Sequence, residues 1–347
     1  MTATPQLLQP NLVHHFYAGG ARIAALRGLP PVERCPEEWV GATVSRADSP
    51  TVGLARTAAG ALFSDLVEAD PVGWVGTDSV RGGDTGILLK LLDAGQRLPV
   101  HVHPDRAFAA QHLDCPYGKT EAWLVLETAD DAVVYLGWSG DVEPDELAAR
   151  RDAQDGDWLL SHLNRIPVRP GDGFVVPAGT PHAIGAGVFV AEVQEPTDFS
   201  ILLEWSITTS TRDESHLGLG FDLAMDAVST TALGADDLAR LTVRHDLTAR
   251  TGAPVPLLPE AGDPYFRLHL LAPPPGESSQ IAAGFAALVV LSGTGVIEGA
   301  GSLPVGGGQS LVVPAAFGPW RLVGDARVLV ARPGEGWRGS PDGRIVG

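Results

Sequence analysis

The chain has 347 residues, of which 44% are hydrophobic, and a formal net charge of −18 at pH 7. This negative charge repels nucleic acid and anionic membrane surfaces, so neither is expected as a partner. No apolar run reaches the roughly 18 residues that span a bilayer, and two cysteines are too few for a disulfide framework. We therefore expect a cytoplasmic protein with reduced thiols.

The first half of the chain predicts short strands, because valine-rich runs alternate with glycine and proline. Residues 1–60 read as small strands and loops rather than helix. A helix is predicted from about residue 142 to 164, because Pro144 and two acidic residues stand in its first turn. The expected strands are 86–94, 98–104, 121–127, 132–138, 188–193 and 200–207, with further short strands inside 166–184.

The second half begins with a loosely amphipathic segment, 215–247, that is predicted to be helical and is ended by several prolines. The β pattern then returns at 265–272, 285–292, 295–298, 310–314 and 326–332. Segments 168–178 and 303–315 resemble each other, since each is a glycine turn followed by a valine strand that ends in Pro-Ala. We predict a mainly β protein of two related barrels: 1–255 with the helical insertions, and 256–347 without metal ligands.

Two histidines at strand spacing are the first candidates for chemistry. His101 and His103 are two residues apart, so their imidazoles emerge on one face of a strand and can share a metal ion. Glu121 from a neighbouring strand and His182 after a Gly-Thr-Pro turn would complete a four-ligand set suited to zinc. Ordinary strand histidines explain the pair equally well when it is taken alone. The joint pattern favours a metal site of the cupin type.

Lysine usage gives an independent indication. Lys90 and Lys119 are the only lysines of the chain, and every other basic side chain is arginine. Lys119 lies two residues before Glu121, and Lys90 lies on the strand before the histidine hairpin, so both can reach one cavity. A lysine in a desolvated metal site can move protons or bind an anionic substrate, although a compositional bias would also explain the pattern.

These segments together resemble the class I mannose-6-phosphate isomerases, a cupin family, particularly their short bacterial branch. The resemblance covers nearly the whole chain and is weakest at the N-terminus and in the second barrel. It is carried by residues 88–94, 100–105, 118–123, 168–184 and 192–194. The implied fold is two cupin jelly-roll barrels with helical insertions. The implied reaction is aldose-ketose isomerisation of mannose 6-phosphate and fructose 6-phosphate through a cis-enediol.

The resemblance also implies roles for individual residues. Members of the family hold zinc with a Gln-x-His pair, a glutamate and a later histidine, which places His103, Glu121 and His182 among the ligands here. Lys119 becomes a candidate for proton handling or phosphate contact. The candidate catalytic residues are Lys119, Lys90 and Glu192. The expected partner is a sugar or sugar phosphate, and the expected state is a monomer or homodimer.

The sequence departs from the family pattern at two places. His101 stands where the family has glutamine, and a stronger imidazole ligand could favour Mn²⁺, Fe²⁺ or Co²⁺ instead of Zn²⁺. The Leu202 region stands where the family has an arginine. Arg212 lies nearby in sequence, whereas Glu195 and Glu204 add negative charge that would disfavour a phosphorylated substrate.

Three hypotheses follow from these observations. The first is a metal-dependent aldose-ketose isomerase that acts on mannose 6-phosphate or on an unphosphorylated or modified sugar. The second is a cupin oxygenase with iron or manganese, although the distance in sequence from the histidine pair to Glu121 is long for that class. The third is a sugar-binding cupin that has lost catalysis, which the missing arginine would explain.

Overall fold

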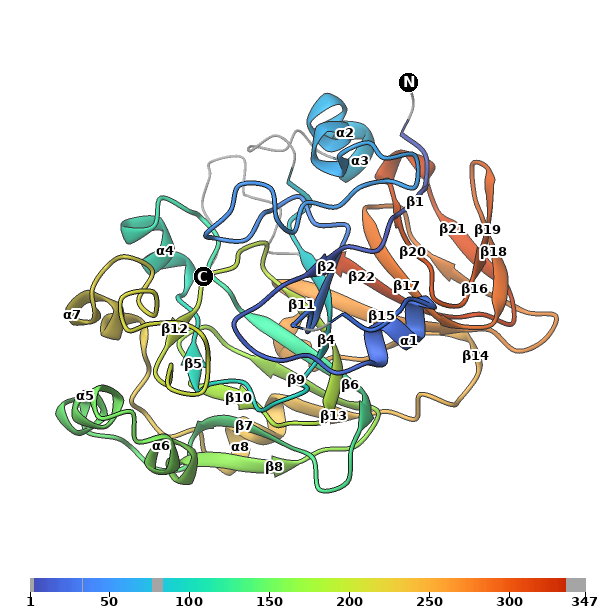
Figure 1. Cartoon of the computed structure of the whole chain (residues 1–347). Helices are drawn as coiled ribbons and strands as arrows, with labels where there is room; N and C mark the ends of the chain where they lie inside the picture. The colour runs from blue at the N-terminus through green and yellow to red at the C-terminus, as the bar shows by residue number, and fades with distance from the viewer. Residues whose placement is uncertain (1–2, 33, 77–83, 335–347) are drawn as a thin grey trace.

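The computed structural model describes residues 3–32, 34–76 and 84–334. Within these residues, antiparallel strands form four sheets, which we call sheets I to IV. In Figure 1 sheet I lies at the centre, sheet II at the lower left, and sheets III and IV on the right-hand side. The predicted mainly β architecture is confirmed.

Sheets I and II form the first pair. Sheet I contains, in spatial order, β13 (Thr242–Arg244), β9 (Asp172–Val176), β6 (Glu121–Thr128), β11 (Val188–Gln194), β4 (Leu88–Asp93), β3 (Glu37–Val40) and β2 (Leu12–Val13). Sheet II contains β12 (Ile201–Leu202), β5 (His101–Val102), β10 (His182–Ile184), β7 (Val133–Trp138) and β8 (Leu163–Pro167). One buried cluster includes Trp123 and Val125 of sheet I with Leu136 and Ile184 of sheet II. The two inner faces therefore pack against each other.

Sheets III and IV form the second pair. Sheet III contains β1 (Gln6–Leu7), β20 (Ser310–Val313), β17 (Ala286–Ser292), β22 (Arg327–Pro333), β15 (Phe266–Ala272) and β14 (Thr251–Pro256). Sheet IV contains β16 (Ser278–Ile281), β21 (Trp320–Gly324), β18 (Thr294–Glu298) and β19 (Ser302–Gly306). Leu288 and Val330 of sheet III pack with Ile297 and Trp320 of sheet IV.

The two pairs are joined through the outer faces of sheets I and III. Leu89 and Leu91 of β4 belong to the same buried cluster as Leu270 of β15 and Val289 of β17. Because side chains alternate along a strand, Lys90 points the other way, into the first pair of sheets. All of β4 is buried, which explains why its sequence is almost continuously apolar. The second pair thus covers the back of the sheet that carries the lysine.

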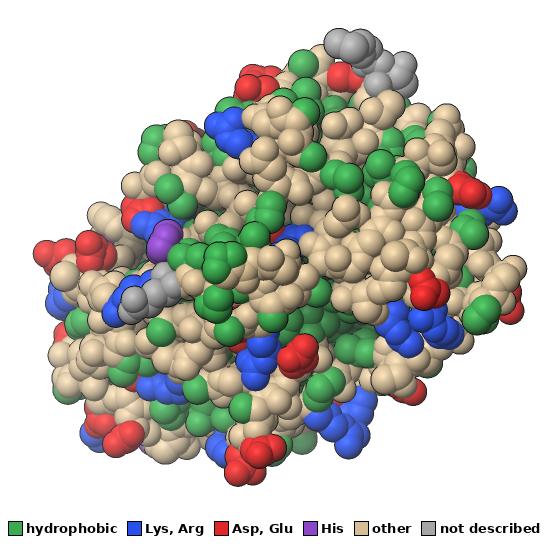
Figure 2. Space-filling view, turned by 45° about the vertical axis from the view of Figure 1, so that its right-hand side comes forward, with side chains coloured by type: hydrophobic (Ala, Val, Ile, Leu, Met, Phe, Trp, Pro, Cys, Tyr) green, Lys and Arg blue, Asp and Glu red, His purple; other side chains and the backbone are tan. Residues whose placement is uncertain are grey.

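Short helices fill the connections. They are α1 (Arg22–Arg27), α2 (Phe63–Ala69), α3 (Pro71–Val75), α4 (Arg106–His112), α5 (Pro144–Asp152), α6 (Gly156–His162), α7 (Phe221–Ala224), η1 (Met225–Ala227), α8 (Ala235–Arg240), η2 (Glu260–Gly262) and η3 (Ala315–Phe317). In the described ranges, none is long and apolar enough to cross a membrane. On the face seen in Figure 2, basic and acidic side chains are interspersed.

The structure corrects three predictions about helices. The segment 215–247 is not one helix but α7, η1 and α8 followed by the strand β13. Gly218 and Gly220 adopt left-handed backbone conformations with φ of 76° and 77°, which stop a helix from running through this segment. The N-terminal region also contains α1, although strands and loops were expected before residue 60. The helix expected at about 142–164 is divided into α5 and α6 at Gln154, where φ is 54°.

The predicted domain boundary at residue 255 falls within β14, which pairs with β15 in sheet III. At the other end of the chain, β1 pairs with β20 in the same sheet. The N-terminal segment therefore reaches into the second pair of sheets. The division into two domains at this boundary stays a prediction.

Packing between sheets I and III predicts a stability difference between two truncations. Leu91→Ala removes a side chain of 0% exposure from the shared cluster and should lower the free energy of unfolding by about 2–5 kcal/mol. Val72→Ala, at a position that is 52% exposed on α3, should change it by less than about 0.5 kcal/mol. Urea unfolding measures both. Equal losses would contradict the assigned packing.

Candidate active site

Three histidines from sheet II meet inside the first pair of sheets. His101 opens β5 and His103 follows two residues later, so strand alternation turns both imidazoles to one face. His182 opens β10 and is the direct register partner of His101. The three side chains are buried, and their nitrogen ligand atoms all lie within 4.8 Å of one another. The structure therefore brings three of the four predicted ligand residues into one cluster.

Each imidazole is oriented by a backbone carbonyl. The Nδ1 atoms lie 2.8, 2.7 and 2.8 Å from the carbonyl oxygens of Pro99, Phe199 and Thr180, for His101, His103 and His182 respectively. A carbonyl oxygen only accepts hydrogen bonds, so each Nδ1 carries the proton. The lone pair of each neutral ring is then at Nε2. This is the tautomer that a metal-binding histidine needs.

Glu121 faces these lone pairs from sheet I. It is the first residue of β6, and its Oε2 lies 2.9 Å from Nε2 of His103 while its Oε1 lies 3.3 Å from Nε2 of His182. Nε2 of His182 is buried and has no hydrogen-bond partner. Acceptor atoms this close repel one another unless a cation lies among them. Three imidazole nitrogens and a carboxylate oxygen are a donor set that fits a divalent metal ion.

Lys119 supplies positive charge at the same place. Its ammonium donates to Oε2 of Glu121 at 2.6 Å and to Nε2 of His103 at 2.7 Å. Burial opposes ionisation of Glu121, but Lys119 and His103 hold the pKa of that carboxyl well below its usual range. Burial and Lys119 lower the pKa of His103 to about 3, and burial together with His182 lowers the pKa of His101. His101 and His103 are thus neutral imidazoles beside an ionised carboxylate.

Sheet I contributes a second polar group beside the histidines. Lys90 of β4 and Glu192 of β11 are register partners, and Nζ of Lys90 lies 3.7 Å from the carboxylate of Glu192 and 3.2 Å from that of Glu37. Burial works against the Lys90 cation, but Glu37 and Glu192 raise its pKa above the ordinary value. Burial and the charge on Glu121 raise the pKa of Glu192 to about 8. Glu192 can therefore hold a proton near neutral pH.

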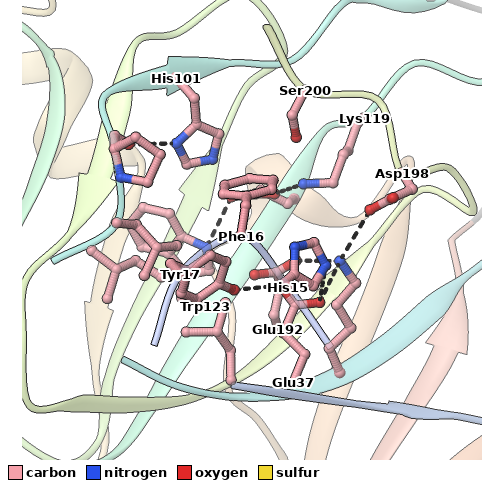
Figure 3. A pocket seen from close by; sticks show the side chains of 16 residues that line it. His15, Phe16, Tyr17, Glu37, His101, Lys119, Trp123, Glu192, Asp198 and Ser200 are labelled. Atoms are coloured by element: carbon pink, nitrogen blue, oxygen red, sulfur yellow. Dashed lines mark hydrogen bonds and ion pairs between the residues drawn. The ribbon is translucent and has the colours of Figure 1, made fainter. Parts of the chain in front are cut away.

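These groups line one small cavity (Figure 3). Its volume is about 30 Å³, and its walls include His101, Lys119, Glu121, Lys90 and Glu192. All three predicted catalytic residues therefore lie at the same cavity as two of the predicted ligands. The cavity has room for a water-sized group only.

A wider pocket of about 340 Å³ adjoins this cavity. The two share His15, Phe16, Asp198 and Ser200 as lining residues. Leu202 lines the wider pocket, and it pairs in register with His101. Arg212 does not line either space, because its side chain reaches Asp152 and stacks over Phe221. It therefore does not stand in for the arginine that the sequence lacks near Leu202.

Glu195 and Glu204 have positioning roles and line neither space. The carboxylate of Glu195 accepts the backbone N–H of Thr120 at 2.9 Å and bonds Arg106 at 2.6 Å. Glu204 bonds Arg97 through both oxygens at 2.7 Å. It also accepts the N–H of Val100 at 3.1 Å, next to His101. Their charges are neutralised by arginine, so the expected negative charge at the site does not come from them.

Sequence reasoning missed the N-terminal part of the site. Tyr17 donates to Glu37, whose other oxygen accepts from the indole of Trp39 at 2.7 Å. His15 lies between the cavity and the wider pocket, with its ring nitrogens buried and without hydrogen-bond partners. The two glutamates of strand β3 could have pointed to this part of the site. The strand is fully buried, and a buried carboxylate needs a hydrogen-bond or ion-pair partner.

The chain is similar in sequence to known mannose-6-phosphate isomerases, although no protein-family model matches it. The probable mannose-6-phosphate isomerase GmuF of Bacillus subtilis is 42% identical over 112 residues, which are 32% of this chain and 34% of that protein. The mannose-6-phosphate isomerase of Streptococcus mutans is 28% identical over 250 residues, 72% of this chain and 74% of that protein. ManA of Bacillus subtilis is 32% identical over 199 residues, 57% and 60% of the two chains. The matched segment thus spans about a third of the first relative.

Solved structures share the whole fold. The mannose 6-phosphate isomerase of Bacillus subtilis has a TM-score of 0.71 at 22% identity, over 95% of this chain and 100% of that one. A mannose 6-phosphate isomerase bound with zinc and yttrium gives 0.71 at 17% identity, over 96% and 100%. The chain therefore has the fold of these isomerases, and its histidine cluster is a candidate metal centre. In sequence the chain is similar to mannose-6-phosphate isomerases over the segments given above.

The raised pKa of Glu192 predicts how the stability of the metal-free protein depends on pH. The pKa of this carboxyl is about 8 in the folded chain, against an ordinary value of 4.5, so folding between these pH values takes up a proton. The free energy of unfolding should therefore fall as pH rises, by up to about 1.4 kcal/mol per pH unit. The lowered pKa values of His101 and His103 make the free energy of unfolding rise with pH, but only at pH values below their ordinary pKa of 6.5.

Denaturant unfolding of the metal-free protein between pH 6.5 and 8 isolates the contribution of Glu192. The glutamine of Glu192→Gln cannot ionise, so the free energy of unfolding of this variant should change less with pH over this interval than that of the parent protein. Identical pH profiles for the two proteins would show that Glu192 is already ionised in the folded state.

Proposed function

We propose that this protein is a metal-dependent aldose-ketose isomerase of the mannose 6-phosphate to fructose 6-phosphate type, acting through a cis-enediol. The observation that carries the proposal is the convergence of three buried imidazoles and Glu121 on one point, beside a protonatable glutamate and a buried lysine. The names of the sequence relatives, which are mannose-6-phosphate isomerases, support the same reaction. A cytoplasmic location is part of the proposal.

His101, His103, Glu121 and His182 would hold the metal. A bound divalent ion would polarise the carbonyl and hydroxyl oxygens of the sugar and stabilise the enediolate. Zinc is our first choice because nitrogen and carboxylate donors suit it and because one solved structure with this fold carries zinc. The third imidazole also suits Mn²⁺, Fe²⁺ or Co²⁺.

Glu192 is the candidate for moving the proton between carbons 1 and 2. A general base works best when its pKa is close to the working pH, and burial raises the pKa of Glu192 to about 8. In a cis-enediol path the proton leaves and returns on one face of the sugar, so one carboxylate can serve both carbons. The metal charge would favour the ionised form and make Glu192 a base at neutral pH.

The two lysines would have different tasks. Lys90 is bound by Glu37 at 3.2 Å and Glu192 at 3.7 Å, so it holds the base in place and stays charged. Lys119 lies 2.6 Å from Glu121 and can donate to an oxygen of the reacting carbons. A cation there stabilises negative charge that develops on the enediolate.

Isomerisation in deuterated water tests the proposal. The zinc-loaded protein is expected to form ketose from mannose 6-phosphate or from mannose and to exchange the hydrogen at carbon 2. His182→Ala should lose at least about 100-fold in this rate and in metal affinity, because removing a ligand costs more than removing its hydrogen-bond partner. His112→Ala, on α4 and outside the cluster, is the matched control and should keep both properties.

Two results would contradict the proposal. Stoichiometric metal without turnover of either sugar would indicate a sugar-binding cupin that does not catalyse this reaction. Oxygen consumption by the iron-loaded protein would indicate a cupin oxygenase instead.

A further inference from the structure

We propose that the sugar on which this site acts carries no phosphate: the substrate class is an unphosphorylated aldose. This inference rests on the isomerase reaction of the proposed function and departs from it in one respect, since the substrate would be the free sugar instead of its 6-phosphate. It comes from the wider pocket, which adjoins the inner cavity and is the space available for the part of the sugar that does not react. The charges and hydrogen bonds of that pocket decide which groups it can accept.

Acidic side chains outnumber basic ones in this pocket. Asp48, Asp198 and Glu214 line it, and Arg46 is the one lysine or arginine among the described residues that do so. His14 and His15 contribute imidazoles. A phosphate dianion placed here would face three carboxylates and a single guanidinium, so the sign of the local field opposes it. The net charge of −18 repels a dianion from the whole molecule as well.

The arginine itself is already bound. Nε of Arg46 donates to Asp48 at 2.5 Å, and its two terminal nitrogens bond the second oxygen of Asp48 and the backbone carbonyl of His14. This bidentate pair occupies the edge of the guanidinium with which arginine would otherwise bind a phosphate. Taking up a phosphate at Arg46 would bring the dianion against Asp48. The guanidinium is therefore a poor phosphate site.

The remaining lining is of the kind that suits a neutral sugar. Leu202, Leu217 and Phe16 provide apolar surface, while Ser200, Thr209 and Ser210 provide hydroxyl groups. Apolar walls with a few polar groups match the carbon–hydrogen faces and hydroxyls of a sugar. Carboxylates are also good acceptors for sugar hydroxyls, which donate hydrogen bonds but carry no charge. The same groups that oppose phosphate would thus bind an aldose.

The lysines of the inner cavity do not reverse this balance. Lys90 lies within 4.0 Å of carboxylates of Glu37, Glu192 and Asp198, and Lys119 is bound to Glu121. Both are surrounded by the negative charge that they neutralise. Neither is left over to bind a phosphate in the wider pocket.

Wild-type protein loaded with zinc tests the inference at pH 7.5 and low salt, above the ordinary pKa of histidine. We expect kcat/KM for mannose to equal or exceed that for mannose 6-phosphate, and calorimetry to give the same order of Kd values. A preference for the phosphate ester of more than about tenfold, which one favourable charge pair would give, overturns it. If neither sugar is turned over, the proposed function fails, while the two Kd values still decide the inference.

Charge variants of the pocket provide a second test. Leu202→Arg adds a cation and should raise the ratio of mannose 6-phosphate to mannose in kcat/KM, or in affinity, by about tenfold. Leu202→Gln, which is polar without a charge, should leave the ratio within about twofold of the parent. Glu214→Gln removes an exposed negative charge and should raise the ratio by about two- to fivefold. If the buried Leu202 position does not tolerate arginine, Glu214→Gln still tests the inference. An unchanged ratio in the folded variants would contradict the inference.

Discussion

Three hydrogen bonds from imidazoles to backbone carbonyls are the constraint on which the site depends. Pro99, Phe199 and Thr180 each present a carbonyl oxygen to one Nδ1 atom, and the register of β5, β10 and β12 sets where these carbonyls lie. The carbonyls leave each ring one orientation and one tautomer. The lone pairs consequently converge beside Glu121, in an arrangement that requires a cation. Lys119 meets part of that requirement, and a divalent metal would meet it more completely.

The opposite wall of the site is built by strand alternation. Lys90, Glu121 and Glu192 point to the inner face of sheet I, while their neighbours in sequence, such as Leu91, Ala122 and Val193, are buried against sheet III. One sheet thus carries a polar site on one face and a core on the other. The second pair of sheets supports the first by covering that apolar face. This explains why a β unit without a histidine cluster among its described residues is joined to the unit that has one.

Much of this arrangement could be predicted from the sequence. The histidines two residues apart, the Pro-Gly-Asp turn before His182 and the two lysines are local patterns, and strand periodicity turns local patterns into shared faces. Glu37 could not be predicted in the same way, because it reaches the site through the pairing of β3 with β4. Tyr17 and His15 lie at the site through their contacts with Glu37. The same holds for Arg46, whose role is determined by Asp48 and the pocket around it. The single helix expected over 215–247 does not form, because glycines in left-handed conformations interrupt this segment.

The coordination of the bound metal is the central claim. X-ray absorption of the zinc-loaded protein measures it directly. We expect a first shell of nitrogen and oxygen at about 2.0–2.1 Å, with the multiple-scattering pattern of three imidazoles. His182→Ala should reduce that pattern to two imidazoles. A shell without imidazole scattering, or one unchanged by His182→Ala, would contradict the account.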